Sequence, residues 1–446
     1  MGMQYIPYTD VLNGIKMTEE KHREILENNY GILDKLTQVY VKGIEELSAS
    51  VCEGKKPIVI KPNEGKPAIG LVVTTFEKGG LEQVVLNLYN GYKKDGYPVY
   101  LLCQKNTLGP MAEQIEDGEL LVFEDSMKLF LYYLQDKHIT VLHYHYNTFG
   151  CIEAKALGVH TLYTMHNVYT WKSDSEITDY SHLLDTMDEV VPVSNLVKKY
   201  YLARTEARED NLKVIYNGID FGELGEKNLP DTLSRKALGI GEDDIVLGFV
   251  ASFYPVKYQI GMIGVMEELM NRYPNVKLLF IGNCENDYHK LFMEELNKSS
   301  AKDTMIHVPY FAHCYMGEFL RRIVDIFTLP TLQEGCSNAV LEAIFCDKPM
   351  VLTDVGNARD VEYLKSCEVV DAAYDDITKT SNDQIMKISS RKNSANKDKL
   401  VEAFSKVIDN IDEYKKAAAI SDEEKKQYET SYMVGQYIDV IKSISK

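Results

Sequence analysis

Short apolar runs alternate with amphipathic stretches over most of the chain after residue 67. The runs are apolar throughout, and the stretches between them place apolar residues three and four positions apart, as in 81–92 and 194–202. Apolar strands that alternate with amphipathic helices are typical of a parallel sheet covered by helices on both faces. The predicted strands are 68–74, 97–103, 119–123, 140–145, 160–165, 189–193 and 213–216, and then 245–251, 276–281, 304–308, 326–329 and 349–353.

A loop-like stretch at 217–241 interrupts this rhythm, and the same alternation then starts again. A chain of 446 residues is long enough for two domains. We therefore predict an α/β protein with two Rossmann-like domains, 67–225 and 226–421, that face each other across a cleft. Domains joined in this way are expected to hinge.

The two ends of the chain differ from this core. Residues 1–66 are predicted to form a helical extension followed by a connector, because apolar residues recur at helical spacing between 19 and 47. This extension is a candidate surface for oligomer contacts. Residues 422–446 are predicted to form a C-terminal helix that packs back on the N-terminal domain.

Charge and composition narrow the range of partners. The 67 Asp and Glu residues outnumber the 49 Lys and Arg residues, which gives a formal net charge of −18 and argues against a nucleic-acid partner. No apolar stretch reaches the roughly 18 residues that span a bilayer, and the N-terminus lacks the pattern of a signal peptide. The eight cysteines are scattered, without a Cys-x-x-Cys pair. A cytoplasmic protein is therefore expected.

A basic and aromatic segment within 194–213 is a candidate contact with anionic lipid at the inner face of the membrane. Carboxylates in the same segment fit a solvated helix face equally well. The residues concerned are Lys198, Lys199, Tyr200, Tyr201, Arg204 and Arg208.

Polar residues follow several predicted strands, and open α/β sheets bind ligands beyond the carboxyl ends of their strands. Gly79 and Gly80 precede a helix, where backbone N–H groups can approach an anion, although a tight turn explains them equally well. His143 and His145 end one strand and His166 follows the next; isolated histidines there are more often structural. No carboxylate or cysteine cluster accompanies them, so no metal site is predicted.

The strongest candidate site follows the fourth predicted strand of the second domain. Ser337 or Asn338 is suited to cap the helix that begins there, and the free N–H groups and dipole of its N-terminus favour a phosphate. Glu334 lies in the loop before this helix and Glu342 about one turn inside it. Because carboxylates repel phosphate, we expect them to bind sugar hydroxyls. Lys257 follows the first strand of the domain and could reach the same phosphates, but alone it fits an ordinary solvated lysine.

Four pieces of the chain, in their order and spacing, resemble the retaining glycosyltransferases of family 4, also called glycosyl transferases group 1, which have the GT-B fold. They are the GGLE sequence at 79–82, the strand ends at His145 and His166, the VIYNGID sequence at 214–220, and the E-x7-E motif at 334–342. The resemblance extends from about residue 69 to residue 360, so the N-terminal extension lies outside it.

The resemblance implies that the N-terminal domain binds the acceptor and the C-terminal domain binds the nucleotide-sugar donor. Glu334 would contact hydroxyls of the donor sugar, Glu342 the ribose, and Lys257 the diphosphate. His166 would lie near the reacting sugar, with His145 on the acceptor side, and the family needs no metal or other cofactor. The implied donor-side residues are Gly79, Gly80, Lys257, Glu334, Gly335, Cys336, Ser337, Asn338 and Glu342.

One position departs from the family pattern. The family commonly has an arginine five residues before Lys257 as a second cation for the diphosphate, but Ser252 stands there. A variant of the pattern has an arginine just before a proline, where this chain has Tyr254. Arg359, in the loop after 349–353 and grouped with His145 on the acceptor side, is the candidate to supply the missing charge.

The predicted function is transfer of a hexosyl group from a nucleoside diphosphate sugar, UDP-linked, to a hydroxyl of a glycan, a lipid-linked sugar or a polymer, with retention of configuration. A UDP-sugar 2-epimerase of the same architecture is one alternative, which the E-x7-E motif disfavours. A non-catalytic accessory subunit of a glycosyltransferase complex is the other. The presence of Lys257, Glu334 and Glu342 argues against a decayed site.

Overall fold

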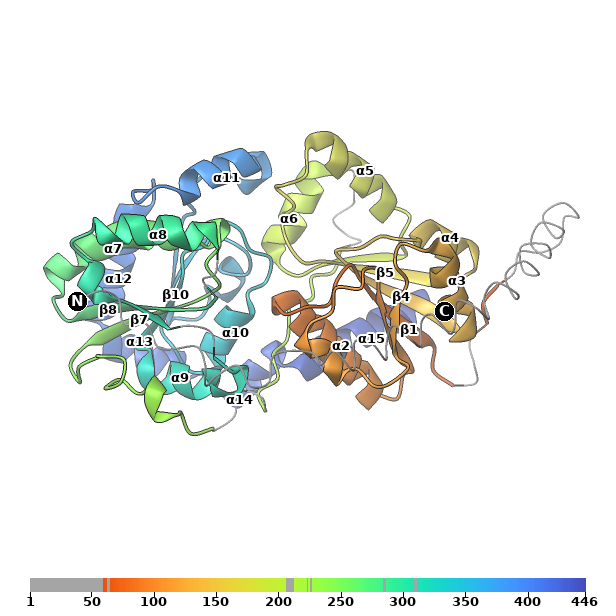
Figure 1. The fold of residues 1–446 in the computed structure, drawn as a ribbon, viewed down its shortest axis with the longest axis horizontal. Coiled ribbons are helices and arrows are strands. Elements are labelled where there is room, and N and C mark those ends of the chain that lie inside the picture. Colours follow the sequence, from red (N-terminus) through yellow and green to blue (C-terminus); the bar gives the residue numbers. More distant parts are fainter. Residues whose placement is uncertain are drawn as a thin grey trace, which may run out of the picture.

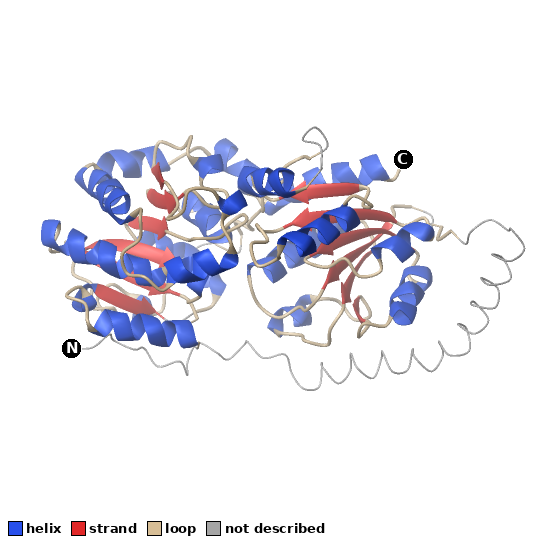
Figure 2. Ribbon diagram, turned by 90° about the horizontal axis from the view of Figure 1, so that it is seen from above, coloured by secondary structure: helices blue, strands red, loops and turns tan. Residues whose placement is uncertain are grey.

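A computed structural model describes residues 59–61, 65–205, 212–222, 224, 227–283, 286–308 and 311–446. These residues form two domains that lie side by side, each with one parallel sheet between layers of helices (Figures 1 and 2). The predicted pair of Rossmann-like domains is therefore confirmed. The helix predicted between 19 and 47 lies outside the described residues.

The N-terminal domain has a six-stranded sheet in the order β3-β2-β1-β4-β5-β6. Its strands are β1 (Ala68–Val73), β2 (Val99–Cys103), β3 (Leu120–Val122), β4 (Ile139–His145), β5 (His160–Met165) and β6 (Glu189–Pro192). The helices are α2 (Gly80–Lys94), α3 (Met127–Asp136), α4 (Cys151–Ala156), α5 (Asp174–Leu184) and α6 (Asn195–Arg204).

The C-terminal domain repeats this topology, with the order β12-β11-β10-β7-β8-β9. Its strands are β7 (Ile245–Val250), β8 (Val276–Ile281), β9 (Met305–Val308), β10 (Ile326–Leu329), β11 (Met350–Thr353) and β12 (Cys367–Val370). The helices are α7 (Gln259–Arg272), α8 (Asp287–Asn297), α9 (Met316–Ile323), α10 (Asn338–Phe345), α11 (Asn382–Ser389), α12 (Lys397–Asp409) and α13 (Ile411–Ala418), and the chain ends in α14 (Asp422–Lys425) and α15 (Thr430–Ile444).

One strand prediction is wrong, and one strand of the structure was not predicted. Residues 213–216 have irregular backbone: the Ile215 N–H donates to the Pro192 carbonyl at 3.1 Å, but 213–216 join no strand of the described sheet. This segment is apolar because Ile215 packs into the core beside the sheet. The pattern also misses β12, because this short edge strand carries Glu368 and has no continuous apolar run.

The C-terminal helix α15 lies on the N-terminal domain, beside α2 (Figure 1). The sheet offers an apolar face for α15 to cover, because successive side chains of β1 point to opposite faces of the sheet and enter two different cores. Ile69 and Leu71 face the core shared with α2 and α15, whereas Ala68 and Val72 face the opposite core. The residues that α15 contributes are Met433, Val434, Tyr437, Ile438, Val440 and Ile441.

The chain crosses between the domains twice, and the two crossings are hydrogen-bonded to each other. The Ile219 N–H donates to the Tyr428 carbonyl at 2.9 Å, and the Thr430 N–H donates to the Ile219 carbonyl at 2.9 Å. A Cβ at Gly218 would lie 2.6 Å from the Glu429 carbonyl oxygen. Because any side chain would separate the crossings, this close approach requires glycine.

Two glycines in these helices give a matched test of the packing. A Cβ at Gly91 in α2 would overlap the methyl groups of Val434, whereas a Cβ at Gly435 in α15 would have no atom within 4 Å. Alanine in place of a helical glycine normally stabilises by about 1 kcal/mol. We therefore expect Gly435→Ala to raise the free energy of unfolding by up to about 1 kcal/mol. Gly91→Ala should lower it by about 1–3 kcal/mol, because the overlap forces the helices apart.

Urea unfolding of both variants, followed by far-UV circular dichroism, measures this difference. A Gly91→Ala protein as stable as the Gly435→Ala protein would contradict the packing of α15 on α2.

Candidate active site

Loops at the carboxyl ends of both sheets meet at the boundary between the domains. In each sheet the strand order reverses between two neighbouring strands, β1 and β4 in one domain and β7 and β10 in the other. Such a reversal leaves a crevice beyond the strand ends, and this is where open α/β sheets bind ligands. The residues that follow β1, β4, β7 and β10 are therefore the ones that build the site.

Lys257 and Glu334 form an ion pair at the reversal point of the C-terminal domain. They follow β7 and β10, which are hydrogen-bonded neighbours, and both side chains are mostly buried, with exposed fractions of 24% and 16%. The Thr331 hydroxyl and the Leu332 N–H donate to the Val256 carbonyl at 2.8 and 2.7 Å, which ties the two loops together. The predicted phosphate cation and the predicted sugar-binding carboxylate are thus one another's partners.

The loop after β10 touches the loop after β5 of the other domain. A Cβ at Gly335 would overlap the carbonyl oxygen of His166. The buried side chain of Gln333 donates to the Val168 carbonyl at 2.6 Å and accepts from the Thr170 hydroxyl at 2.9 Å. These contacts bring His166 beside the loop that carries Glu334, as the predicted cleft requires.

The N-termini of α2 and α10 face each other across the same boundary. The Asn338 side chain, at the start of α10, donates to the Gly80 carbonyl, at the start of α2, at 3.4 Å. Gly79 and Gly80 are both exposed. The Glu82 carboxylate lies close to Gly79, and burial raises its pKa. Two helix ends of positive character therefore lie next to each other at this boundary.

The start of α10 is held by side-chain amides. Ser337 occupies the N-cap position, but its hydroxyl makes no capping hydrogen bond; instead its N–H donates to the Asn357 side chain at 3.0 Å. Asn217, from the inter-domain crossing, donates to the Cys336 carbonyl at 2.9 Å and to the Asn338 side chain at 3.0 Å. The segment that the resemblance assigns to the donor is therefore fixed from both domains.

Glu342 lies inside α10 and is buried. One of its carboxylate oxygens is 2.8 Å from Nε2 of His313, which lies between β9 and α9. No sequence pattern points to His313, because the two residues meet only when the domain has folded. A carboxylate oriented by an imidazole is well suited to accept hydrogen bonds from vicinal hydroxyls.

The three histidines at the ends of β4 and β5 form a buried row. His145 Nδ1 lies 2.8 Å from His166 Nε2, and the ring centroids of His143 and His145 are 4.2 Å apart. Burial lowers the pKa of all three, that of His166 to about 3. His166 is therefore neutral near pH 7 and a weak proton acceptor, and His145 is the side chain that orients its ring.

Arg359 is not free to replace the missing arginine. Its guanidinium forms ion pairs with three carboxylates, those of Asp354, Glu362 and Asp371. Ser252 and Tyr254 are exposed, and both are uncharged residues. Of the four positions considered for a diphosphate cation, 252, 254, 257 and 359, the one with a positive side chain beside Glu334 is thus Lys257.

The segment proposed to contact lipid is less exposed than its sequence indicates. Tyr200 and Tyr201 are buried, and Arg204 forms an ion pair with Asp174 and donates to the Thr378 carbonyl at 3.4 Å. Arg208 lies outside the described residues. Within the described ranges, no helix combines the length and the apolar character needed to cross a bilayer.

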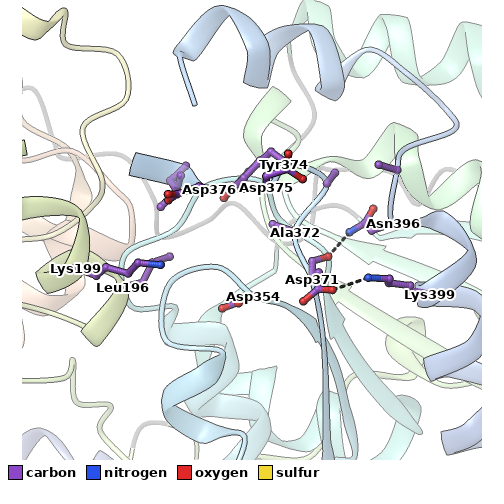
Figure 3. Close-up of a pocket in the computed structure, with 13 residues that line it drawn as sticks. Leu196, Lys199, Asp354, Asp371, Ala372, Tyr374, Asp375, Asp376, Asn396 and Lys399 are labelled. Carbon is purple, nitrogen blue, oxygen red and sulfur yellow. Dashed lines mark hydrogen bonds and ion pairs between the residues drawn. The ribbon is translucent and has the colours of Figure 1, made fainter. Parts of the chain in front are cut away.

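A polar cavity of about 400 Å³ lies beside this site, between α6 and the carboxyl ends of β11 and β12 (Figure 3). Lys199 of α6 extends toward it from one domain, and Asp354 and Asp371 line it from the other. Asp371 is paired with Lys399 at 2.6 Å. The hydroxyl of Tyr374, which also lines the cavity, donates to a carbonyl of the loop that carries Glu334, so the cavity adjoins that loop.

Two family models match the chain. Glycosyltransferase Family 4 matches residues 78–223, and Glycosyl transferases group 1 matches residues 231–396, so each domain has its own match and the two together span most of the described chain. The chain belongs to the family 4 glycosyltransferases.

Curated relatives of this glycosyltransferase include a phosphatidylinositol N-acetylglucosaminyltransferase GPI3 subunit from Saccharomyces cerevisiae, 23% identical over 219 residues, or 48% of this chain and 46% of the relative. The chain thus spans about half the length of the curated relatives it matches first. A UDP-Gal:α-D-GlcNAc-diphosphoundecaprenol α-1,3-galactosyltransferase from Escherichia coli is 20% identical over 376 residues, or 75% of this chain and 92% of the relative.

Solved structures with the same fold include HepE from Anabaena in complex with UDP-glucose. That chain is 15% identical, with a TM-score of 0.66, and the match covers 85% of this glycosyltransferase and all of HepE. A glycosyltransferase from Rickettsia africae has a TM-score of 0.66 at 16% identity, with coverage of 86% and 99%. At this level of identity the likeness establishes the GT-B fold.

The contact between Gly335 and His166 can be tested with two alanine variants. Gly335→Ala would press a methyl group against the His166 carbonyl, which we expect to destabilise the closed arrangement by about 1–3 kcal/mol and to separate the domains. At Gly80, at the start of α2 in the N-terminal domain, a Cβ would meet only the Asn338 side chain, at 3.8 Å.

Small-angle X-ray scattering of both variants measures the separation. Gly335→Ala should have a larger radius of gyration than the unmodified protein, and Gly80→Ala the same radius. Equal radii for all three proteins would show that Gly335 does not hold the domains together.

Proposed function

We propose that this glycosyltransferase moves a hexosyl group from a UDP-sugar to a hydroxyl of a glycan or glycolipid, with retention of anomeric configuration. The observation that supports this most strongly is that the N-termini of α2 and α10 are in contact, and that Lys257 is paired with Glu334 in the loop that leads into α10. A helix N-terminus attracts anions through its dipole and its free N–H groups. Two such ends and one ammonium group suit the two phosphates of a nucleoside diphosphate.

The carboxylates suit the remaining parts of the donor. When a phosphate takes Lys257, Glu334 loses its ion-pair partner and is left to accept hydrogen bonds from hydroxyls of the transferred sugar. Glu342, beside His313, is placed deeper in α10 and is assigned to the ribose. UDP as the carrier is supported by HepE, which was solved with UDP-glucose, and by the Escherichia coli relative named for UDP-galactose.

In the proposed reaction the bond between the anomeric carbon and the phosphate oxygen breaks, and the leaving UDP gains negative charge. Lys257 and the α10 N-terminus stabilise that charge, as preorganised dipoles do in other enzymes. The acceptor oxygen bonds to the anomeric carbon on the face that UDP leaves. Its proton passes to the departing phosphate oxygen, because His166, with a pKa of about 3, is too weak a base. No metal or other cofactor enters this scheme.

The names of two relatives support a proposal for the acceptor and the setting. The Escherichia coli relative is named for a sugar carried on diphosphoundecaprenol, and the Saccharomyces cerevisiae relative for phosphatidylinositol. We therefore place the reaction in the cytoplasm, at the inner face of the membrane, with a glycolipid as one acceptor class.

Variants of Lys257 and Glu334 distinguish the effect of this ion pair on donor binding from its effect on sugar transfer. Lys257→Ala should weaken UDP binding about 10- to 100-fold, because a charge-assisted hydrogen bond contributes about 1.5–3 kcal/mol. Glu334→Gln should keep or strengthen UDP binding, since it removes the carboxylate that competes with phosphate for Lys257. The same variant should slow sugar transfer by about 100- to 1000-fold. Calorimetry with UDP and UDP release from UDP-sugars measure the two effects.

Two further variants serve as controls. Lys290→Ala removes an exposed lysine of α8 and should change neither measurement. His166→Ala should slow transfer while UDP binding persists, because UDP is assigned to the other domain. Failure to bind UDP at millimolar concentration would instead favour an accessory subunit, and isomerised sugar from UDP-N-acetylglucosamine alone would favour an epimerase.

A further inference from the structure

Trp171 is the single tryptophan of the chain, and 48% of its surface is exposed. It follows Thr170, whose hydroxyl donates to Gln333 of the other domain, and it lies on the same loop as His166. Because tryptophans are usually well buried, an exposed indole at this place is unusual. Trp171 therefore lies at the edge of the site, in the N-terminal domain, which is the domain expected to bind the acceptor.

The indole is held in place by other aromatic rings. The ring of Tyr169, which is fully buried, contacts Trp171 edge-on with 5.2 Å between centroids. The ring of Tyr146 lies 6.3 Å from Trp171 and 5.5 Å from the imidazole of His166. A continuous series of ring contacts therefore leads from His166 to Trp171, and a ring packed in this way has little freedom to turn away.

The surroundings of the indole are polar. Residues 173–176, the start of α5, are exposed and supply hydroxyl and carboxylate groups. Ser173 and Glu176 bond to each other in a capping box, whereas Asp174 is paired with Arg204 and is almost fully exposed. An alkyl chain binds to a contiguous apolar patch, which these neighbours interrupt. A sugar ring suits them, because it has an apolar C–H face for the indole and hydroxyls for the polar groups.

We propose that Trp171 is the platform on which a pyranose ring of the acceptor stacks, next to the hydroxyl that is glycosylated. The C–H groups of the sugar carry a small positive charge and face the negative π surface of the indole. This inference rests on the proposed glycosyl transfer and makes a carbohydrate, rather than a lipid chain, the part of the acceptor nearest the reacting centre.

The single tryptophan is also the reporter for the test. Fluorescence of the full chain, saturated with UDP, is followed during titration with methyl α-D-glucopyranoside, methyl β-D-galactopyranoside and the methyl glycoside of N-acetylglucosamine. Glycerol at equal hydroxyl concentration and decyl phosphate are the comparison ligands. Because stacking uses a C–H face common to pyranosides, at least one sugar should give a saturable change and glycerol none. A response to decyl phosphate alone, or to no sugar, would overturn the proposal.

Kinetics give a second readout. Trp171→Ala should raise the KM for a pyranoside acceptor about three- to tenfold, with a much smaller change in the KM for the UDP-sugar. The acceptor KM of Trp171→Phe should lie between those of the unmodified protein and Trp171→Ala. Tyr432→Ala, which removes a similarly exposed aromatic residue (49%) on α15, should change neither value. An unaltered acceptor KM in Trp171→Ala would refute the platform. UDP binding and UDP release are measured separately, so failure of the proposed transfer reaction is distinguishable from failure of this inference.

Discussion

The backbone of the loop after β10 lies directly on the backbone of the loop after β5, at Gly335 and His166. Glycine is required there because the carbonyl of one domain occupies the place of a side chain in the other. Gln333 reinforces the contact with two hydrogen bonds that are buried and so protected from water. Together with the hydrogen-bonded crossings at Ile219 and Thr430, this contact fixes which strand ends of the two sheets face each other.

A second consequence is electrostatic. Closing the domains brings two helix N-termini together, and positive ends that face each other repel unless an anion lies between them. Glu334 supplies part of that negative charge locally, while paired with Lys257. A diphosphate can take over this role and release Glu334 for the sugar. In the proposed function, the same few charges hold the site together and bind the anionic donor.

Sequence alone predicts the sheets well, because strands buried on both faces are continuous apolar runs: β5, β8 and β10 have the predicted bounds. It also predicts that Lys257 and Glu334 lie at strand ends, because the topology fixes where such residues gather. It does not predict that these two residues pair, or that Gln333 binds Thr170, since they are 77 and 163 positions apart and meet only through folding and domain docking. The error at 213–216 has a related cause. This segment leads into the crossing between the domains and packs into a core, so its apolar residues give the same sequence pattern as a buried strand.

In the proposed complex, the diphosphate of the donor lies between the N-termini of α2 and α10 and is bound to Lys257. A crystal structure of the protein with UDP tests it most directly. We expect phosphate oxygens within hydrogen-bonding distance of Lys257 Nζ and of the first N–H groups of α10, with the ion pair between Lys257 and Glu334 broken. A diphosphate bound elsewhere, for example in the cavity beside α6, with that ion pair intact, would contradict it.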